Sequence, residues 1–238
     1  MEDMNFLKEN AKEFGIYLSD RQLMQFHDYY YILNEWNHKL NLTAITDFQD
    51  VMIKHFLDSI SIFKFIDFSQ NDKLIDVGTG AGFPGIPIKI VFPGIHVTLL
   101  DSLNKRIIFL DELIHDLDLS GIETIHGRAE EIGRKKEYRE SYDFAVSRAV
   151  ANLNSLSEIC LPFLKNGGKF ISYKSEHAGE EVSSAMDVFS LLGGTFKNCF
   201  HFYLPRSDFE RNLILVDKVS SVPDRYPRKP GKPFKDPL

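Results

Sequence analysis

The residues with the clearest capacity for chemistry form a glycine-rich turn. The stretch Asp76-Val77-Gly78-Thr79-Gly80-Ala81-Gly82-Phe83-Pro84-Gly85 follows an apolar, β-type run, and a helix is expected to begin near Gly85. A strand that leads through glycines into a helix exposes backbone N–H groups and lets a ligand approach the main chain closely. The pattern predicts a nucleotide-type cofactor site, and a tight turn without a ligand is the alternative.

The spacing of the glycines selects between cofactors. Dinucleotide-binding turns carry G-x-G-x-x-G, but Phe83 occupies the position of the last glycine. The run D-x-G-x-G-x-G resembles the first motif of Rossmann-like S-adenosylmethionine (SAM) methyltransferases, which implies SAM as the cofactor. The turn residues expected to bind it are Asp76, Gly78, Gly80, Gly82 and Phe83.

Charged residues follow other expected strands, where doubly wound sheets bind their ligands. Asp101 lies 23 residues after Gly78, near the offset of roughly 20 at which a carboxylate accepts hydrogen bonds from ribose hydroxyls. Alternatively, Asp101 caps the next helix, a role for which Ser102 and Asn104 compete.

Three further loops complete the predicted site. The loop Gly127-Arg128-Ala129-Glu130-Glu131 either contacts an adenine edge or is a solvated helix start. Arg148 either holds the SAM carboxylate or a guanine ring, or is a solvated surface residue. Arg148 and Lys174, after the fifth strand, are the candidates for a catalytic role, which the sequence leaves unassigned.

Apolar periodicity predicts the elements that position these residues. Residues 1–68 are expected to be helical, with caps at Ser19-Asp20 and Thr46-Asp47 and a break at 36–43. From Lys73 onward, short apolar runs alternate with helical stretches, which predicts βαβ units and a parallel sheet. Strands are expected at 73–77, 96–100, 123–126, 142–147, 169–173, 196–203 and 212–218, and helices at 85–92, 105–117, 153–164 and 180–192.

The predicted fold class is α/β, a Rossmann-like SAM methyltransferase with a seven-stranded, mostly parallel sheet, helices on both faces, an antiparallel last strand and a helical N-terminal extension. The last two strands lack a helix between them, so we expect a hairpin at the sheet edge. The third of the core helices is expected to stop at Gly167-Gly168. We divide the chain into a helical N-terminal subdomain packed on the core (1–68), a methyltransferase domain (69–218) and a basic, Pro-rich C-terminal segment (219–238), extended or disordered until bound.

Composition restricts the setting and the chemistry. A net charge of −6 gives no global indication of nucleic-acid binding. Two cysteines, Cys160 and Cys199, lie in apolar stretches, which indicates buried thiols in a reducing compartment rather than nucleophiles. We expect a cytoplasmic monomer that binds no metal and no membrane. His55 and Asp58 are expected to form a helix-face contact rather than a metal site.

With no nucleophilic cysteine and no metal site expected, the reaction that remains is methyl transfer to a ring nitrogen that has a free lone pair. The Asn/Asp/Ser-Pro-Pro-Tyr/Phe motif of amino-directed adenine methyltransferases is absent. Guanine N7 has no proton to remove, so alignment and electrostatics can carry the reaction without a general base.

Several motifs together narrow the resemblance. In order, they are similar to those of the bacterial ribosomal RNA small subunit methyltransferase G family: Asn37-x-x-x-Asn41-Leu42-Thr43, Lys54-His55-Phe56-Leu57-Asp58-Ser59, the glycine turn, Gly127-Arg128-Ala129-Glu130, Ser147-Arg148-Ala149 and Tyr226-Pro227-Arg228-Lys229-Pro230-Gly231-x-Pro233. Membership implies SAM-dependent methylation of a guanosine N7 in 16S rRNA, free or in the small ribosomal subunit. It also implies cofactor contacts at Gly78, Phe83, Ala129, Glu130 and Arg148. The alternatives are a methyltransferase for a small molecule or protein and a non-catalytic SAM-binding module.

The C-terminal segment supplies a local basic patch. Residues 220–238 hold five basic and two acidic residues, with Tyr226 and Phe234 interleaved. Cations that follow phosphates and aromatic rings that stack on bases are typical of single-stranded RNA recognition, and a solvated polar tail is the alternative. The predicted RNA-binding residues are Arg206, Arg211, Arg225, Tyr226, Arg228 and Lys229.

Overall fold

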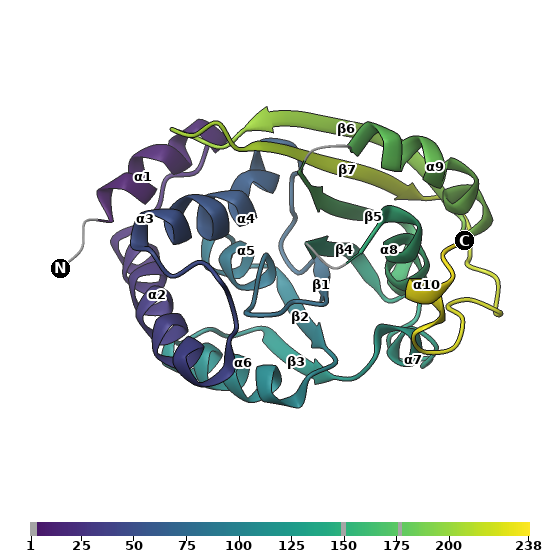
Figure 1. Cartoon of the computed structure of the whole chain (residues 1–238), viewed down its shortest axis with the longest axis horizontal. Coiled ribbons are helices and arrows are strands. Elements are labelled where there is room, and N and C mark those ends of the chain that lie inside the picture. The colour runs from purple at the N-terminus through teal and green to yellow at the C-terminus, as the bar shows by residue number, and fades with distance from the viewer. Residues whose placement is uncertain (1–3, 149–150, 176–177) are drawn as a thin grey trace.

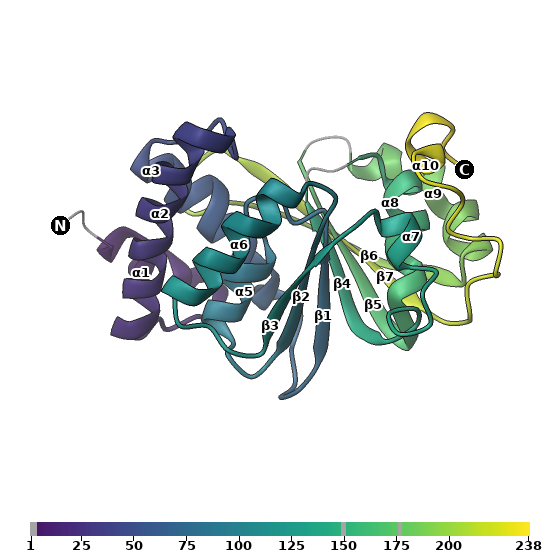
Figure 2. The ribbon, with the colours of Figure 1, turned by 90° about the horizontal axis from the view of Figure 1, so that it is seen from below.

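A seven-stranded sheet runs through the middle of the molecule (Figures 1 and 2) in the computed structural model, which describes residues 4–148, 151–175 and 178–238. The strand order is β3-β2-β1-β4-β5-β7-β6. Strands β1 to β5 pair in parallel, whereas β7 is antiparallel to both β5 and β6. The predicted seven strands and edge hairpin are confirmed, with the bounds β1 Lys73–Val77, β2 His96–Asp101, β3 Ile122–His126, β4 Tyr142–Arg148, β5 Leu164–Lys174, β6 Gly194–Tyr203 and β7 Glu210–Lys218.

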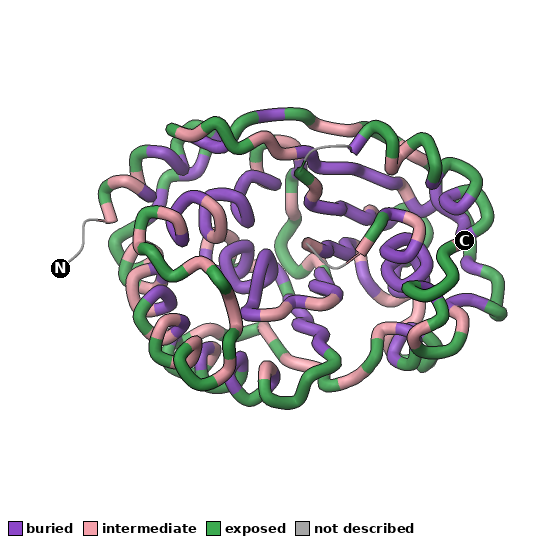
Figure 3. The backbone as a smooth tube through the Cα atoms, in the orientation of Figure 1, coloured by how far each residue is buried: buried purple, intermediate pink, exposed green. Residues whose placement is uncertain are grey.

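Helices cover both faces of the sheet (Figure 2), and buried residues are concentrated in its central strands rather than in the edge strands β3 and β6 (Figure 3). Neighbouring residues of β1 point to opposite faces, since Leu74 packs in one apolar core and Ile75 in the other. The first core is covered by helices α1 Asn5–Ala11, α2 Asp20–Leu40, α3 Phe48–Val51, α4 Asp58–Ile60, α5 Gly85–Val91 and α6 Asn104–Asp116. The second is covered by α7 Ala129–Ile132, α8 Leu153–Cys160 and α9 Ala178–Leu191, with α10 Lys232–Lys235 against α8.

The N-terminal helices begin where their caps predict. Ser19 and Gln22 form a reciprocal capping box at the start of α2, and the side chain of Asp47 accepts a hydrogen bond from the N–H of Asp50 at the start of α3. The break expected at 36–43 is confirmed within these bounds, because α2 ends at Leu40 and its C-cap residue, Asn41, has a φ of 50°.

A π-helical segment, Met52–Leu57, joins α3 to α4. Its wider turn changes the direction in which successive side chains point. Lys54 and His55 of this segment and Asp58, which follows it, consequently face the carboxyl ends of the strands, where Arg148 contacts the last two.

The helix stop expected at Gly167-Gly168 is also wrong. Helix α8 ends at Cys160, and a 3-10 turn, Leu161–Phe163, follows it. The two glycines lie within β5, where the pairing register with β4 shifts between Tyr142 and Phe144.

The C-terminal segment is packed against the core, which corrects the expectation of an extended or disordered tail. Val222, Tyr226 and Pro233 are buried. The hydroxyl of Ser155 in α8 donates to the carbonyl of Pro233 at 2.7 Å. Single buried residues and polar contacts, rather than a periodic apolar face, hold this segment.

Candidate cofactor and substrate site

The glycine turn after β1 requires glycine at several positions. Gly78, Gly80 and Gly82 have φ values of 75°, 63° and 97°, a region that side-chain-bearing residues rarely adopt. The N–H groups of Gly78 and Thr79 both donate to the carbonyl of Leu100, at 2.9 and 3.1 Å. The turn is therefore fixed to the end of β2.

Asp76 supports this turn from beneath. One oxygen of its fully buried carboxylate accepts hydrogen bonds from the Thr79 hydroxyl at 2.7 Å and the Gly85 N–H at 2.8 Å. Burial raises the pKa of Asp76 to about 6, against the effect of these two hydrogen bonds. A side chain at Gly85 would collide with Leu99 and with Asp76 itself, so the helix can begin here only at a glycine.

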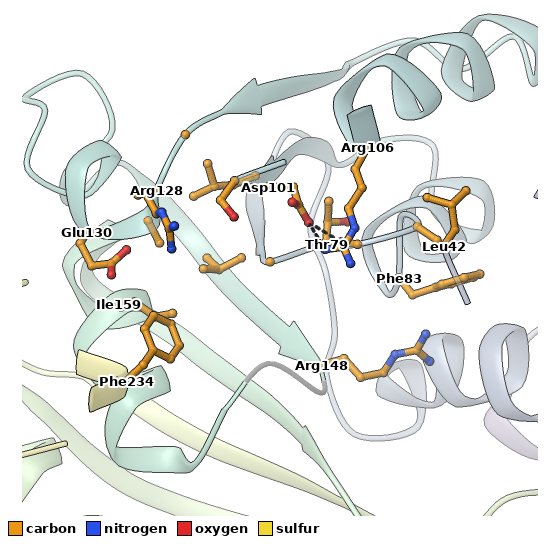
Figure 4. A pocket seen from close by; sticks show the side chains of 18 of the residues that line it. Leu42, Thr79, Phe83, Asp101, Arg106, Arg128, Glu130, Arg148, Ile159 and Phe234 are labelled. Atoms are coloured by element: carbon orange, nitrogen blue, oxygen red, sulfur yellow. Dashed lines mark hydrogen bonds and ion pairs between the residues drawn. The ribbon is translucent and has the colours of Figure 1, made fainter. Parts of the chain in front are cut away.

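A cavity of about 440 Å³ opens above the turn (Figure 4), within the usual size range of ligand pockets. Seven of the predicted cofactor residues line it: Gly78, Gly80, Phe83, Asp101, Ala129, Glu130 and Arg148. Asp76 and Gly82 are not among the lining residues. Asp76 lies under the turn, and a Cβ added at Gly82 would meet Ile86 and Tyr29. Their predicted contact with the cofactor stays a prediction, and their observed role is to support the turn.

Asp101 forms part of the cavity wall and also fixes the loops around it. Its side chain accepts from the Gly80 N–H at 3.0 Å, from the Leu103 N–H at 2.9 Å and from Arg106 at 3.1 Å. The helix-capping alternative is wrong, because Leu103 is the N-cap residue of α6 and no side chain caps this helix. Arg106 also lines the cavity and was not predicted, because no local motif marks it.

Phe83 lies in an aromatic stack that joins the turn to the N-terminal helices. Its ring is nearly parallel to Tyr29 at 5.2 Å and to His55 at 4.5 Å, and the Arg148 guanidinium lies 4.9 Å from its centre. The hydroxyl of Tyr29 donates to the carbonyl of Ala81 at 2.6 Å. Helix α2 therefore fixes the shape of the turn.

His55 is held as a neutral imidazole between Arg148 and Thr43. Burial and the positive charge of Arg148 lower the pKa of His55 to about 3. Because a guanidinium only donates, Nδ1 accepts from Arg148 at 3.4 Å, and the proton on Nε2 is directed at the Thr43 hydroxyl at 2.9 Å. The sequence predicts for His55 only a helix-face contact with Asp58, and the contacts with Arg148 and Thr43 are additional.

The two candidates for a catalytic role occupy different positions. Arg148 lines the cofactor cavity and is bound to Asp58 at 3.1 Å. Lys174 is not among the residues that line this cavity, and its ammonium contacts Glu181 at 2.7 Å and the carbonyl of Ala151 at 2.6 Å.

The C-terminal segment reaches the opposite wall of the cavity. The N–H of Gly231 donates to the buried carboxylate of Glu130 at 2.7 Å, and Phe234 of α10 lines the cavity (Figure 4). The sequence pattern predicts that Phe234 stacks on RNA bases, whereas in the structure it lines the cofactor cavity. Its contribution to the cavity wall depends on packing that the local sequence does not encode.

The predicted RNA-binding residues divide into exposed and internally bound side chains. Arg206, Arg225 and Lys229 are exposed. Arg211 is bound to Asp58 at 3.0 Å. The predicted stacking of Tyr226 on a base is wrong for this conformation because its side chain is buried. Arg228 forms a two-pronged ion pair with Glu158, with bonds of 2.9 and 2.6 Å, so it stabilises the fold.

The cavity fits the cofactor that its motif implies. A Cβ added at Gly80 would meet no atom within 4 Å, so a ligand can lie directly against the main chain there. Asp101 offers acceptor oxygens for ribose hydroxyls, Ile159 and Phe234 offer apolar surface for a purine, and Arg148 offers a cation for a carboxylate. Among the described residues, no group of three or more His, Cys, Asp or Glu side chains could hold a metal ion, and no helix is long and apolar enough to cross a membrane.

Comparisons with known proteins agree with this geometry. Solved structures of similar fold include the YcgJ protein of Bacillus subtilis, with a TM-score of 0.55 and 12% identity over 70% of this chain and 100% of that chain. Another is TrmN of Thermus thermophilus, with a TM-score of 0.53 and 15% identity over 68% and 48% of the two chains. At such identities these likenesses concern the fold alone.

Relatives of higher identity carry a common name, ribosomal RNA small subunit methyltransferase G. The protein from Acetivibrio thermocellus is 53% identical over 98% of this chain and 95% of its own length. The protein from Alkaliphilus metalliredigens is 48% identical over the whole of both chains. The family model described as rRNA small subunit methyltransferase G matches residues 22–213. The chain belongs to the rRNA small subunit methyltransferase G family.

Proposed function

We propose that this protein transfers a methyl group from SAM to N7 of a guanosine in the 16S rRNA of the small ribosomal subunit. The observation that carries the proposal is the cavity bounded by the glycine turn, Asp101 and Arg148, in a chain that belongs to this family. Family membership favours rRNA over a small molecule or a protein as the substrate, and an enzyme over a non-catalytic module.

Each wall of the cavity has a separate task in this proposal. Asp101 binds the ribose hydroxyls, and the loop at Ala129 and Glu130 with Phe234 encloses the purine. Arg148 holds the carboxylate at the end of the cavity nearest Phe83. When bound, SAM supplies an electrophilic methyl group on a positively charged sulfur.

The methyl transfer requires the protein mainly to align guanine N7 with the methyl group. The lone pair of guanine N7 forms the new N–C bond as the C–S bond breaks, so no proton leaves and no general base is needed. Neutral His55 adds no positive charge beside a sulfonium, since its pKa is lowered to about 3. The packing of the turn against α2 fixes the backbone that would hold the cofactor.

The RNA contacts of the surface are part of the same proposal. Arg206, Arg225 and Lys229 are exposed and free of the buried pairs that occupy Arg211 and Arg228, and we assign them to phosphate contacts. The division into residues 1–68, 69–218 and 219–238 is retained, with the last part now assigned to both cofactor enclosure and RNA contact. We place the enzyme in the cytoplasm, as a monomer.

Incubation with tritiated SAM and small ribosomal subunits that lack the modification tests the proposal. Label is expected in 16S rRNA at a guanosine that becomes sensitive to N7-specific chain cleavage. Gly78→Asp is the matched inactive control. Gly78 lines the cavity and has a φ of 75°, so an aspartate there would strain the turn and put a charged side chain in the site. Absence of label, or label on another base, would overturn the assignment.

A further inference from the structure

A second cavity, of about 450 Å³, lies beside the cofactor cavity and shares two of its side chains, His55 and Arg148. Its other lining residues come from the loop before α3, from the π-helical segment and Asp58, from the ends of β5 and β7, and from Glu181 of α9. Among its lining residues, four are cationic (Lys54, Arg148, Lys174 and Arg211) and two are anionic (Asp58 and Glu181). An excess of cations in a partly enclosed space favours an anionic ligand.

The shared wall is held rigidly. Asp58, which is buried, accepts from Arg148 at 3.1 Å through one oxygen and from Arg211 at 3.0 Å through the other. Arg148 is the last residue of β4, and Arg211 lies near the start of β7. The carboxylate of Asp58 therefore links two strands that are separated by β5. The buried carboxylate of Asp58 therefore holds the guanidinium groups of both arginines in the partition.

The far wall carries an ion pair with remaining hydrogen-bonding capacity. Lys174 and Glu181 are 2.7 Å apart, with side chains that are 11% and 28% exposed. The ammonium carries three N–H groups, and its other partner among the described residues is the carbonyl of Ala151. The Glu181 bonds to Lys174 and to the Leu153 N–H both end on Oε2. A donor and an acceptor thus stand side by side at this wall.

We propose that the second cavity receives the target guanosine, turned out of the rRNA, with Lys174 and Glu181 recognising its base edge. This inference rests on the proposed function. Guanine presents an acceptor, O6, beside N–H donors on its pairing edge, whereas adenine presents the opposite order. Lys174 donates to O6 and Glu181 accepts from the ring and amino N–H groups, so N7 faces the partition and the cofactor cavity.

The surroundings of the cavity suit a nucleotide that belongs to a longer strand. Lys54 lies 4.6 Å from the ring centre of Phe209, which is 38% exposed. Exposed Arg206 lies in the same β6–β7 hairpin. Cations beside an exposed aromatic ring are suited to phosphates and an unpaired neighbouring base.

The test compares two lysines of one strand. Lys174→Met removes the proposed donor, and Lys169→Met is the matched control, because Lys169 also lies in β5 and forms an ion pair with Asp217 at 2.9 Å. For Lys174→Met we expect kcat/KM for unmodified small subunits to fall by at least about tenfold, with the affinity for S-adenosylhomocysteine changed less than twofold. Lys169→Met leaves both unchanged.

Three results would overturn the proposal. Unchanged kcat/KM in Lys174→Met removes the lysine from base recognition. An equal loss of cofactor affinity in a folded Lys174→Met protein assigns the second cavity to the methionine end of the cofactor. If kcat/KM falls by the same factor in Lys169→Met, the loss in Lys174→Met comes from the change in net charge and not from a contact with the base. Failure of the wild type to label any guanosine would instead contradict the proposed function.

A second variant tests the acceptor independently of the lysine. Inosine at the target position lacks the amino group that Glu181 is proposed to bind, so the wild type should methylate subunits reconstituted with inosine at least about tenfold less efficiently. Glu181→Gln retains an oxygen for the Leu153 N–H and should discriminate less than about threefold. If Glu181→Gln prefers guanosine over inosine as strongly as the wild type does, the Glu181 carboxylate does not bind the amino group of the base.

Discussion

The carboxylate of Glu130, at the start of α7, accepts a hydrogen bond of 2.7 Å from the backbone N–H of Gly231, 101 residues further along the chain. Glu130 is 2% exposed and lines the cofactor cavity. The C-terminal segment is therefore bound to the same side chain that the family resemblance assigns to the cofactor.

Removal of this link should loosen the C-terminal segment and weaken cofactor binding together. Glu130→Ala leaves the Gly231 N–H without its acceptor and frees Phe234 from the cavity wall. We expect faster amide exchange at 229–235 and about tenfold weaker binding of S-adenosylhomocysteine, measured by hydrogen–deuterium exchange and calorimetry. Glu131→Ala, at the exposed neighbouring residue, should change neither; unaltered exchange in Glu130→Ala would contradict the link.

Replacement of Arg228 should lower folding stability, whereas replacement of Arg225 should affect RNA binding. The carboxylate of Glu158 is fully buried beneath Arg228, and removal of one partner of such a pair costs roughly 3–5 kcal/mol. Arg228→Ala should therefore lower the urea midpoint strongly. Arg225→Ala, which removes an exposed cation, should leave the midpoint unchanged and reduce the salt dependence of RNA binding by about one counterion. Equal midpoints for the two variants would show that the buried pair contributes little.

Two glycines of the cofactor turn should respond differently to alanine. In Gly82→Ala, the new Cβ would lie 2.7 Å from Ile86 and 2.8 Å from the Tyr29 hydroxyl, at a φ of 97°, and we expect a loss of roughly 2–4 kcal/mol of folding stability. In Gly80→Ala, the Cβ meets no protein atom within 4 Å. That variant should lose only roughly 1–2 kcal/mol, and its main defect should be weaker cofactor binding. Chemical denaturation and calorimetry separate the two, and a Gly80→Ala protein with wild-type affinity would contradict the placement of the cofactor.

His55 should make the folded state sensitive to mild acid. Its pKa is about 3 in the folded protein against an ordinary 6.5, so below pH 6.5 the unfolded chain takes up a proton that the folded chain does not. Stability is thus lost as the pH falls from 6.5 toward 3, by about 2 kcal/mol at pH 5. The stability difference between wild type and His55→Gln should be constant above pH 7 and shrink below pH 6.5. If this stability difference stays constant from pH 7 to pH 5, the imidazole of His55 takes up its proton in the folded protein as readily as in the unfolded chain.

The parts of the fold that the sequence predicted are those with local patterns. Alternating apolar runs marked all seven strands, and the glycine turn marked Gly78, Gly80 and Phe83 as cavity residues because φ and backbone access depend on the residues themselves. Asp101 and Arg148 were found because each ends a strand of the sheet.

The parts that the sequence missed depend on partners that are distant along the chain. Arg228 was assigned to RNA, but its partner Glu158 lies 70 residues away, and nothing near either residue encodes the pair. Phe234 reaches the cavity through the packing of α10 against α8, and Arg106 reaches it through its ion pair with Asp101, which no motif marks. The second cavity depends on the π-helical turn at 52–57, which apolar periodicity does not distinguish from an ordinary helix.

Arg148 lines both cavities, so one guanidinium lies against the cofactor and the target nucleotide in the proposed complex. Two ligands that share a side chain in this way are thermodynamically linked, and the factor by which one changes the affinity for the other is the same in both directions. In the proposed complex, binding of the methyl donor and binding of the target nucleotide should therefore change each other's affinity by one common factor. The charge lost from the sulfur on methyl transfer lies next to the guanidinium that both ligands would share, so the donor and its product are expected to differ in this factor.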